Sequence, residues 1–247
     1  MAQIISLVNH KGGVGKTTST LNLGKALSIL GKKVLVIDID PQANLSQSVG
    51  IDEPQNTVYD VLCNNVPLPI YNIDEKFAIV PAELRLSMAE NNLQAEQVTG
   101  YFKLRKALQS IKQNYDYILI DCPPSLGILT INALLASTHL IIVVEPQYLA
   151  VKGLQTIIDL YKRLKDDLNT DLSILGLLIT QFNRTVVSKS IIEQIQRKYK
   201  NVVLNTIIRQ NVKITEASAL RKDIFQHDAQ SAGAQDYLAL AKEIIAI

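Results

Sequence analysis

The sequence predicts an α/β fold with one doubly wound, mostly parallel sheet of seven to eight strands flanked by helices. Three observations lead to this prediction. Short runs rich in Val, Ile and Leu alternate with longer helical patterns along the whole chain. Several runs, such as "LIIVV", are continuously apolar, which is typical of strands covered by helices on both faces. The 247 residues are 47% hydrophobic with no Trp, which favours one aliphatic core and a single domain over residues 1–247, without an N-terminal helix-turn-helix extension.

Seven segments have the composition and length of strands, and helical patterns lie between them. The expected strands are residues 4–9, 33–39, 77–82, 116–122, 139–145, 174–182 and 202–208. The clearest helical patterns are residues 16–31, 100–114, 151–168, 188–200 and 234–247. In the first of these, Leu23, Ala26 and Leu27 share an apolar face, and Gly31 is a natural stop. Because such sheets bind ligands at the carboxyl ends of their strands, the residues that follow each strand are the candidates for chemistry.

The first strand is followed by "NHKGGVGKTT", which opens the first helix. Glycines let backbone N–H groups approach a phosphate, and the helix N-terminus favours an anion. Lys16 can reach the β- and γ-phosphates, and the Thr17 hydroxyl can ligate Mg²⁺. His10 stands where the common phosphate-loop pattern has its first glycine, so the motif is a variant. The expected ATP-binding residues here are Lys11, Gly12, Gly13, Val14, Gly15, Lys16, Thr17 and Thr18.

Three aspartates follow or end later strands. Asp38 and Asp40, in "DIDPQANLS", project on the same side of an extended segment. One carboxylate can hold the hydration shell of Mg²⁺, and the other can orient an attacking water. Asp121 ends an apolar run in the pattern of a Walker B acid. ATP and Mg²⁺ are therefore the expected ligands, with Thr17, Asp38 and Asp121 at the metal.

The remaining composition excludes several classes of protein. Cys63 and Cys122 make neither a disulfide framework nor a metal motif, and we expect Cys122 to be a small buried residue. No segment approaches the about 20 apolar residues of a membrane span, and the start lacks the pattern of a signal peptide. We therefore expect a soluble, cytoplasmic protein.

Charge is concentrated in the last third of the chain. Residues 184–222 hold nine Lys or Arg and two Glu, a net charge of +7, whereas the rest carries −5. Such a segment favours nonspecific contact with nucleic-acid phosphates, and the expected lack of a helix-turn-helix extension argues against sequence-specific reading. The expected DNA-binding residues are Lys189, Arg197, Lys198, Lys200, Lys213, Arg221 and Lys222.

The motifs "KGGVGKTT", "DIDPQANLS" and "DCPPSLG", in this order and spacing, resemble the ParA/Soj branch of the deviant Walker A ATPases. The resemblance extends through "NTIIRQNVKITEASA" and "HDAQSAGAQDYLALAKEI", and so covers nearly the full chain. It implies slow, Mg²⁺-dependent ATP hydrolysis and a homodimer that forms on ATP binding. It also implies nonspecific DNA binding on the nucleoid and release by a ParB-like centromere-binding protein.

The resemblance also implies roles for single residues. Lys11 would reach across the dimer to the partner's nucleotide, where a cation offsets the repulsion between two ATP molecules. Asp40 would position the hydrolytic water, which makes Lys11, Lys16 and Asp40 the catalytic set. Base recognition would come from Asn183, Arg209 and Asn211. The family commonly has "PRN" where this chain has "RQN", which leaves the adenine pocket and one DNA contact open.

Other members of this superfamily do different work. A membrane-surface ATPase like MinD would need a basic amphipathic C-terminal helix, whereas "DYLALAKEIIAI" has one cation, Lys242. A reductase like the nitrogenase iron protein would need two cluster-ligating cysteines per subunit, and Cys63 and Cys122 are misplaced for that. A positioner of protein clusters shares every motif, so a plasmid, chromosome or protein cargo stays open.

Overall fold

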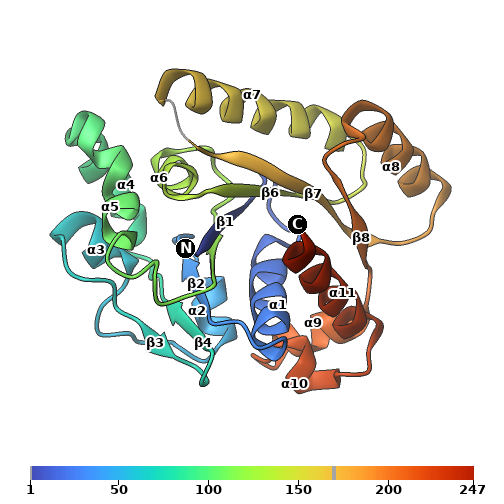
Figure 1. Cartoon of the computed structure of the whole chain (residues 1–247), viewed down its shortest axis with the longest axis horizontal. Coiled ribbons are helices and arrows are strands. Elements are labelled where there is room, and N and C mark those ends of the chain that lie inside the picture. Colours follow the sequence, from blue (N-terminus) through green and yellow to red (C-terminus); the bar gives the residue numbers. More distant parts are fainter. Residues whose placement is uncertain (1, 169–170) are drawn as a thin grey trace.

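The computed structural model, which describes residues 2–168 and 171–247, has one eight-stranded sheet between two layers of helices (Figure 1). The strands are β1 (Gln3–Val8), β2 (Val34–Asp38), β3 (Tyr71–Asn72), β4 (Phe77–Val80), β5 (Tyr117–Asp121), β6 (His139–Val144), β7 (Ser173–Phe182) and β8 (Val203–Arg209). Their order in the sheet is β3-β4-β2-β5-β1-β6-β7-β8. The seven expected strands are confirmed, and β3 is an additional two-residue strand.

The sheet is parallel apart from its β3 edge, which pairs with β4 in the antiparallel sense. β1 lies in the middle, hydrogen-bonded to β5 on one side and to β6 on the other. In the pairing of β2 with β5, Asp38 is the register partner of Asp121. The parallel register therefore places these two acids side by side near the carboxyl edge, level with Leu7 of β1.

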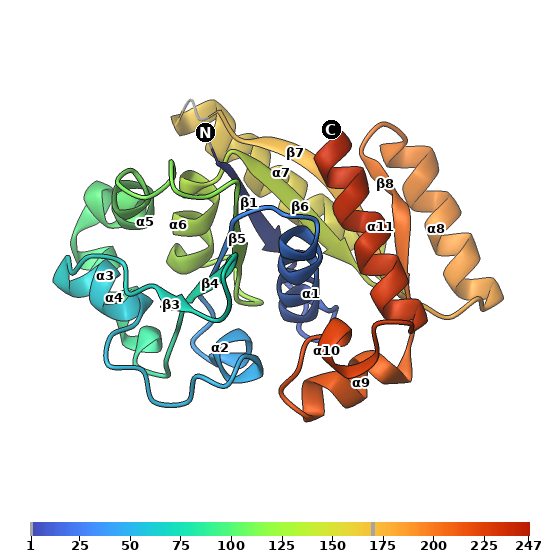
Figure 2. The same cartoon turned by 60° about the horizontal axis from the view of Figure 1, so that its bottom comes forward.

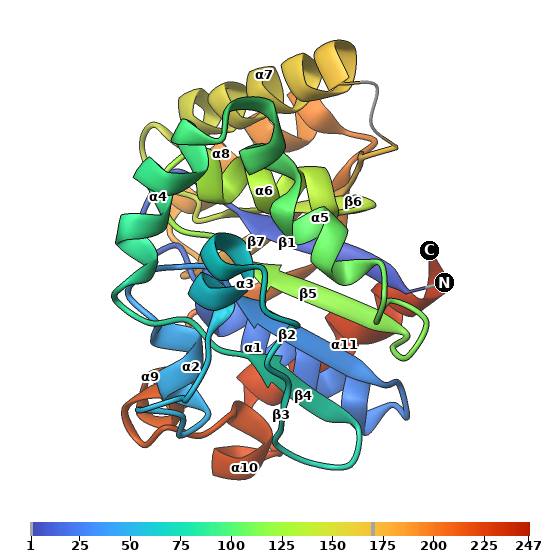
Figure 3. The same cartoon turned by 90° about the vertical axis from the view of Figure 1, so that its left-hand side faces the viewer.

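Helices cover both faces of the sheet. They are α1 (Lys16–Ile29), α2 (Asn44–Ser48), α3 (Val58–Asn64), α4 (Leu86–Ala95), α5 (Lys103–Leu108), α6 (Ile128–Ala136), α7 (Ala150–Leu168), α8 (Val186–Tyr199), α9 (Val212–Ala219), α10 (Ile224–Asp228) and α11 (Ala232–Ala246), with a 3₁₀ helix at Gln97–Phe102. Figure 3 shows α4 to α8 on one side and α1 with α11 on the other. Each layer buries its own apolar cluster against the strands, which explains the continuously apolar strand sequences.

Local sequence sets the ends of some helices and not of others. Gly31 adopts φ +88° just after α1, as expected of a glycine that stops a helix. The helical pattern of residues 100–114 forms a 3₁₀ helix and the short α5, which ends at Leu108, followed by turns. In those turns the N–H groups of Ile111 and Lys112 both donate to the Leu108 carbonyl.

Helix α1 lies unusually close to the sheet. A Cβ atom on Gly24 would come within 2.8 Å of the Phe77 ring and 3.0 Å of Val36. Glycine at this position therefore permits the close approach that holds α1, and the phosphate loop at its start, against the strands.

Candidate nucleotide-binding site

A cavity of about 710 Å³ opens at the carboxyl edge of the sheet, beside the start of α1. In Figure 2, α2 and α9 lie on opposite sides of the start of α1, and residues of both helices line the cavity. The lining residues come from the phosphate loop, from the β2–α2 segment, and from the ends of β7 and β8 with α9. They include Gly12, Gly13, Gly15, Lys16, Thr17, Thr18, Asp40, Gln42, Asn44, Gln47, Ser48, Thr180, Gln181, Arg209, Asn211, Arg221 and Tyr237.

The phosphate loop adopts backbone conformations with positive φ at two of its glycines, as the sequence predicts. Gly13 and Gly15 adopt φ +78° and +89°, in the left-handed region that side chains disfavour. Gly15 stands directly before α1, so the N–H groups of the first helical turn face the cavity. This end of the cavity is therefore suited to an anion such as a phosphate group.

Two side chains at the end of β7 hold this loop in place. The Thr180 hydroxyl donates to the Val14 carbonyl at 2.8 Å, and the Gln181 amide donates to the Gly13 carbonyl at 2.6 Å. Sequence reasoning did not identify these residues, because they lie more than 160 positions from their partners. A polar pair that ends an otherwise apolar strand at the ligand-binding edge was the available signal.

Lys16 is buried at the floor of the cavity. Its ammonium group donates to the Lys11 carbonyl at 3.2 Å, and the residue is 6% exposed. Burial lowers the pKa of Lys16, and the nearby charge of Asp121 opposes that shift. An ammonium group has three donors, so Lys16 keeps donors for a bound phosphate.

Asp38 and Asp121 meet beneath the cavity, and both are fully buried. The oxygens of Asp38 accept hydrogen bonds from the backbone N–H of Asp40 and from the N–H and hydroxyl of Ser46. Burial raises the pKa of Asp38 to about 6. The pKa of Asp121 lies well above its ordinary value, first because of burial and then because of the Asp38 charge. Two like charges in a low-dielectric environment each favour the neutral form of the other.

One oxygen of Asp121 fits a bound cation. Its Oδ2 is buried without a hydrogen-bond partner, while Oδ1 accepts from Thr20 at 3.4 Å. Within the described residues, no three His, Cys, Asp or Glu side chains gather into a metal-binding group. Mg²⁺ bound through one or two carboxylates and the phosphates of a substrate needs no such group. This arrangement of Asp121 and Thr17 therefore fits magnesium better than a metal held by protein groups alone, and Asp38 lies beside Asp121 in the sheet.

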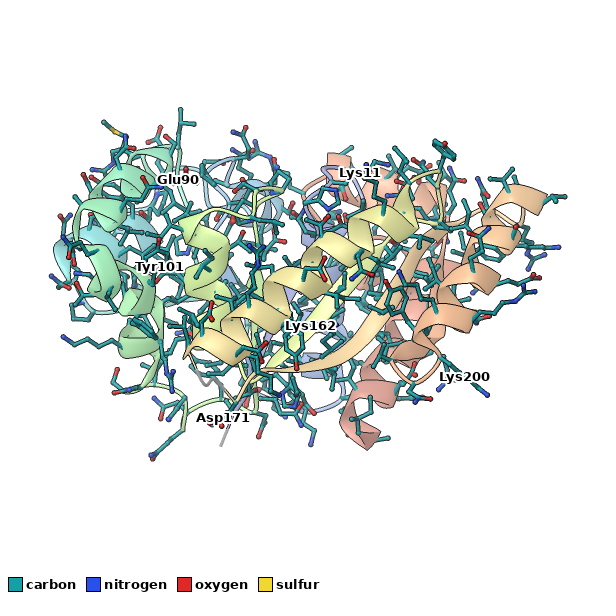
Figure 4. The ribbon with its side chains drawn as sticks, turned by 90° about the horizontal axis from the view of Figure 1, so that it is seen from above. Lys11, Glu90, Tyr101, Lys162, Asp171 and Lys200 are labelled. Carbon is teal, nitrogen blue, oxygen red and sulfur yellow. The ribbon has the colours of Figure 1, made fainter. Side chains whose placement is uncertain are left out.

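Asp40 and Lys11 differ in their position relative to the cavity. Asp40 lines the cavity, and its Oδ1 accepts from the Gln42 N–H at 3.0 Å. Lys11 lies outside the lining, with 51% of its side chain exposed. Its ammonium group contacts Glu145 at 3.1 Å and Gln147 at 2.7 Å, and Figure 4 places it at the N-terminal end of α7. In the single chain, the β6–α7 loop therefore holds the Lys11 ammonium.

The three residues expected to recognise the adenine base differ in their position relative to the cavity. Arg209 and Asn211 line the cavity, whereas Asn183 does not. The Arg209 guanidinium forms a forked contact with Asp236 of α11, at 2.6–3.1 Å. Asn211 caps α9 by accepting from the Lys213 N–H. The Asn183 Oδ1 accepts from the hydroxyls of Thr185 and Ser188, and so fixes the start of α8.

The basic residues do not form one compact patch. Lys189 and Lys200 lie at opposite ends of α8, about 16 Å apart along its axis. Arg197, Lys213 and Arg221 pair with Glu193, Glu216 and Asp52, and Lys198 donates to Gln155. Among the described residues, no ion-pair partner lies near Lys189, Lys200 or Lys222.

Several polar residues of the β2–α2 segment also line the cavity without having been predicted individually. These are Gln42, Asn44, Gln47 and Ser48. Their signal was the motif "DIDPQANLS", in which only the aspartates were assigned a role. By contrast, the expectation for Cys122 is confirmed, since the thiol is fully buried and its pKa is raised to about 12 by burial.

A phosphate loop opening α1, a Walker-type acid ending β5 and a cavity at the carboxyl edge of a parallel sheet define a P-loop nucleotide-binding protein. A family model described as "AAA domain" matches residues 2–174. The chain is 41% identical to the sporulation initiation inhibitor protein Soj of Bacillus subtilis, over 100% of this chain and 99% of that protein. It is 42% identical to the chromosome-partitioning ATPase Soj of Treponema pallidum, over 100% and 98%.

Among solved structures, the septum site-determining protein MinD of Pyrococcus horikoshii, complexed with Mg-ADP, is similar. It has a TM-score of 0.81 and 30% identity, and covers 99% of this chain and 96% of that chain. This chain therefore belongs to the ParA/Soj family of deviant Walker A ATPases, as the motifs predicted. None of the helices in residues 2–168 and 171–247 is both long enough and apolar enough to cross a membrane.

Proposed function

We propose that this ATPase partitions DNA by cycling between an ATP-bound dimer on DNA and a released form. The observation that carries the proposal is the similarity, over its full length, to a chromosome-partitioning ATPase. The dimer would coat cytoplasmic nucleoid DNA without sequence preference. A ParB-like centromere-binding partner would stimulate slow hydrolysis and release it.

The cavity supports ATP binding with the phosphates at the α1 end. Residues 12–18 supply backbone N–H groups, and the buried Lys16 supplies a positive charge. The nucleoside would then extend toward Arg209 and Asn211, with Asn183 supporting the neighbouring α8. When bound, Mg²⁺ neutralises charge on the phosphates, and Thr17, Asp121 and Asp38 are the residues that would hold it.

Asp40 and Lys11 would act on the reaction from the two sides of the phosphate loop. Asp40 is nearly buried, follows β2 and faces the cavity, so its carboxylate can orient a water toward the terminal phosphate. Lys11 is half exposed and lies outside its own cavity. This position suits a cation that leaves Glu145 and enters the nucleotide site of a second copy of the chain.

DNA binding would rest on the basic residues from α8 to the end of α9. In one chain they are divided between the two ends of α8 and the segment beyond β8, and several are paired with acids. A dimer doubles the number of positive charges that can contact one duplex. We therefore expect ATP-dependent binding whose log K falls linearly with log salt, with a slope of about −0.9 per phosphate neutralised.

The deciding experiment measures dimerisation and DNA binding of wild type, Lys11→Ala and Lys162→Ala, with ATP and with ADP. Lys162 is the control, because it is an exposed lysine in the C-terminal half of α7, away from the phosphate loop (Figure 4). We expect Lys11→Ala to stay folded but to lose ATP-dependent dimers and DNA coating, and Lys162→Ala to behave as wild type. Normal ATP-dependent dimers of Lys11→Ala, or equal DNA binding by the nucleotide-free monomer, would contradict the proposal.

Asp40→Ala tests the other half of the cycle. Without the carboxylate that orients the water, hydrolysis stops while ATP binding continues. We expect this variant to remain as a dimer on DNA after wild type has been released. Release of Asp40→Ala at the wild-type rate would remove Asp40 from the hydrolytic step.

The similarity to MinD raises a second candidate, an ATPase that positions proteins or acts on a membrane surface. Against membrane binding, Tyr237, Leu240 and Ile244 of α11 are buried in the core beside α1. The apolar face of the last helix is therefore occupied. Co-sedimentation with anionic liposomes in the presence of ATP would support this alternative.

A further inference from the structure

An ion pair joins the two sides of the nucleotide cavity at its rim. Arg221 Nη1 donates to both carboxylate oxygens of Asp52, at 2.9 and 2.7 Å. The two residues are 169 positions apart in the sequence. Arg221 itself lines the cavity, and both side chains are about half exposed, at 55% and 52%.

Asp52 belongs to the α2 side of the cavity. It follows α2 through Gly50, and the Ile51 N–H donates to the Ser46 carbonyl inside that helix. Ser46 in turn holds Asp38 through its N–H and hydroxyl groups. Hydrogen bonds therefore connect the segment of Asp52 with α2 and with Asp38.

Arg221 belongs to the opposite side, at the end of α9. The Lys222 N–H donates to the Ala217 carbonyl and the Arg221 N–H to the Ser218 carbonyl, which is the Schellman pattern of helix termination. The residue at the position of Arg221 in this pattern is usually glycine, because its φ is positive. Arg221 adopts φ +53°, which a side chain disfavours. Arginine at this position can form a side-chain contact that glycine cannot, and within the described residues its side chain pairs with Asp52.

We propose that the Arg221–Asp52 ion pair is a latch that slows the release of nucleotide from the cavity. α2 and α9 lie on opposite sides of the lower end of α1 in Figure 2, and the pair joins the segments that follow these two helices. A nucleotide that leaves past this rim must wait for the pair to open. The inference rests on the proposed function, since it takes ATP as the occupant, and it assigns Arg221 to nucleotide retention in place of DNA contact.

The latch contributes an amount typical of an exposed ion pair. Such pairs change free energies by about 0.2–1 kcal/mol. We therefore expect the dissociation rate of nucleotide to rise about 1.4- to fivefold when the pair is broken, since about 1.4 kcal/mol corresponds to tenfold. Because salt screens exposed charges, high salt should raise the wild-type rate toward that of the broken pair.

The test follows release of a fluorescent ATP analogue, chased with unlabelled ATP, from wild type, Asp52→Asn, Arg221→Gly and the double variant. Glu193→Gln is the matched control, because it breaks an exposed ion pair with Arg197 on α8, outside the cavity. Each single variant should release the analogue about 1.4- to fivefold faster, the double variant no faster than either, and the control at the wild-type rate. Arg221→Gly should not lower Tm, since glycine relieves the positive φ.

Several results would overturn the latch. Unchanged rates in both single variants, with the analogue still bound, would remove it while leaving the proposed function intact. Effects that simply add in the double variant would show that the two residues act separately. A loss of DNA affinity in Arg221→Gly with an unchanged rate would make DNA phosphate the ligand of Arg221. A wild type that binds no nucleotide would overturn the proposed function and the latch together.

Discussion

Removing one hydroxyl group at the end of β7 should weaken ATP binding through the phosphate loop. Thr180→Val keeps nearly the same shape but removes the donor to the Val14 carbonyl at 2.8 Å. Both residues are 1% exposed, so water has no access to the carbonyl that loses its partner. A buried acceptor left without its donor costs about 1–3 kcal/mol.

This cost sets the size of both expected effects. For a chain of this length, Tm falls by about 2–4 °C for each kcal/mol of lost stability. In the nucleotide-free variant, movement of the loop can recover about 1 kcal/mol of this cost. ATP binding then has to return the loop to its position, and this reduces the binding free energy by the same amount. We therefore expect the Kd for ATP to rise about fivefold. The effect would act through Val14 of the phosphate loop.

Thermal unfolding and titration with a fluorescent ATP analogue measure the two effects. Thr138→Val is the control, because the Thr138 hydroxyl also bonds a backbone carbonyl, that of Ile4, but at the amino end of β1. The control should lower Tm and leave the Kd for ATP unchanged. A lower Tm with unchanged ATP affinity in Thr180→Val, or an equal loss of affinity in Thr138→Val, would refute this reasoning.

Three further predictions concern the packing and the acids. Gly24→Ala should destabilise the chain by about 1–3 kcal/mol, because its methyl group overlaps the Phe77 ring; an unchanged midpoint of urea unfolding would contradict this. Asp121→Asn should raise the Tm of the nucleotide-free chain, because it removes a buried carboxyl group that lies beside Asp38 and has one oxygen without a hydrogen-bond partner. The same change should reduce the stabilisation by Mg²⁺ and ATP; equal stabilisation of variant and wild type would argue against Asp121 at the metal. Burial raises the pKa of Asp38 from 3.8 to about 6, so the folded chain binds more protons in this interval and loses stability as the pH rises through it. Relative to Asp38→Asn, the nucleotide-free wild type should lose up to about 3 kcal/mol between about pH 4 and pH 6, and parallel stability curves for the two proteins would exclude this effect.

The departure from "PRN" at residues 209–211 has a structural counterpart. Arg209 stands where the family commonly has proline, and its guanidinium is held by Asp236 of α11. This contact raises the pKa of Arg209 and ties the end of β8 to α11. The Arg209 side chain is therefore committed to its own chain, although it still lines the cavity.

The sequence by itself determined the order of strands and helices along the chain, the mostly parallel sheet and the residues of the phosphate loop. These follow from features that are local, namely the alternation of apolar runs, the glycines before α1 and the acids that end β2 and β5. The pairing of Asp38 with Asp121 also follows once β2 and β5 are neighbours in a parallel sheet.

Only the tertiary structure decided which distant side chains support the site. Thr180 holds Val14, Lys11 rests on Glu145, and Arg221 reaches Asp52, across 166, 134 and 169 positions of sequence. No local pattern encodes such pairs, because each pair forms only when the packing of the fold brings two distant segments into contact. The same reason explains why the basic residues are close in sequence but divided in space. Helix α8 begins after the carboxyl end of β7 and ends before the amino end of β8, so its two ends lie far apart. Acidic side chains also pair with several of the basic residues.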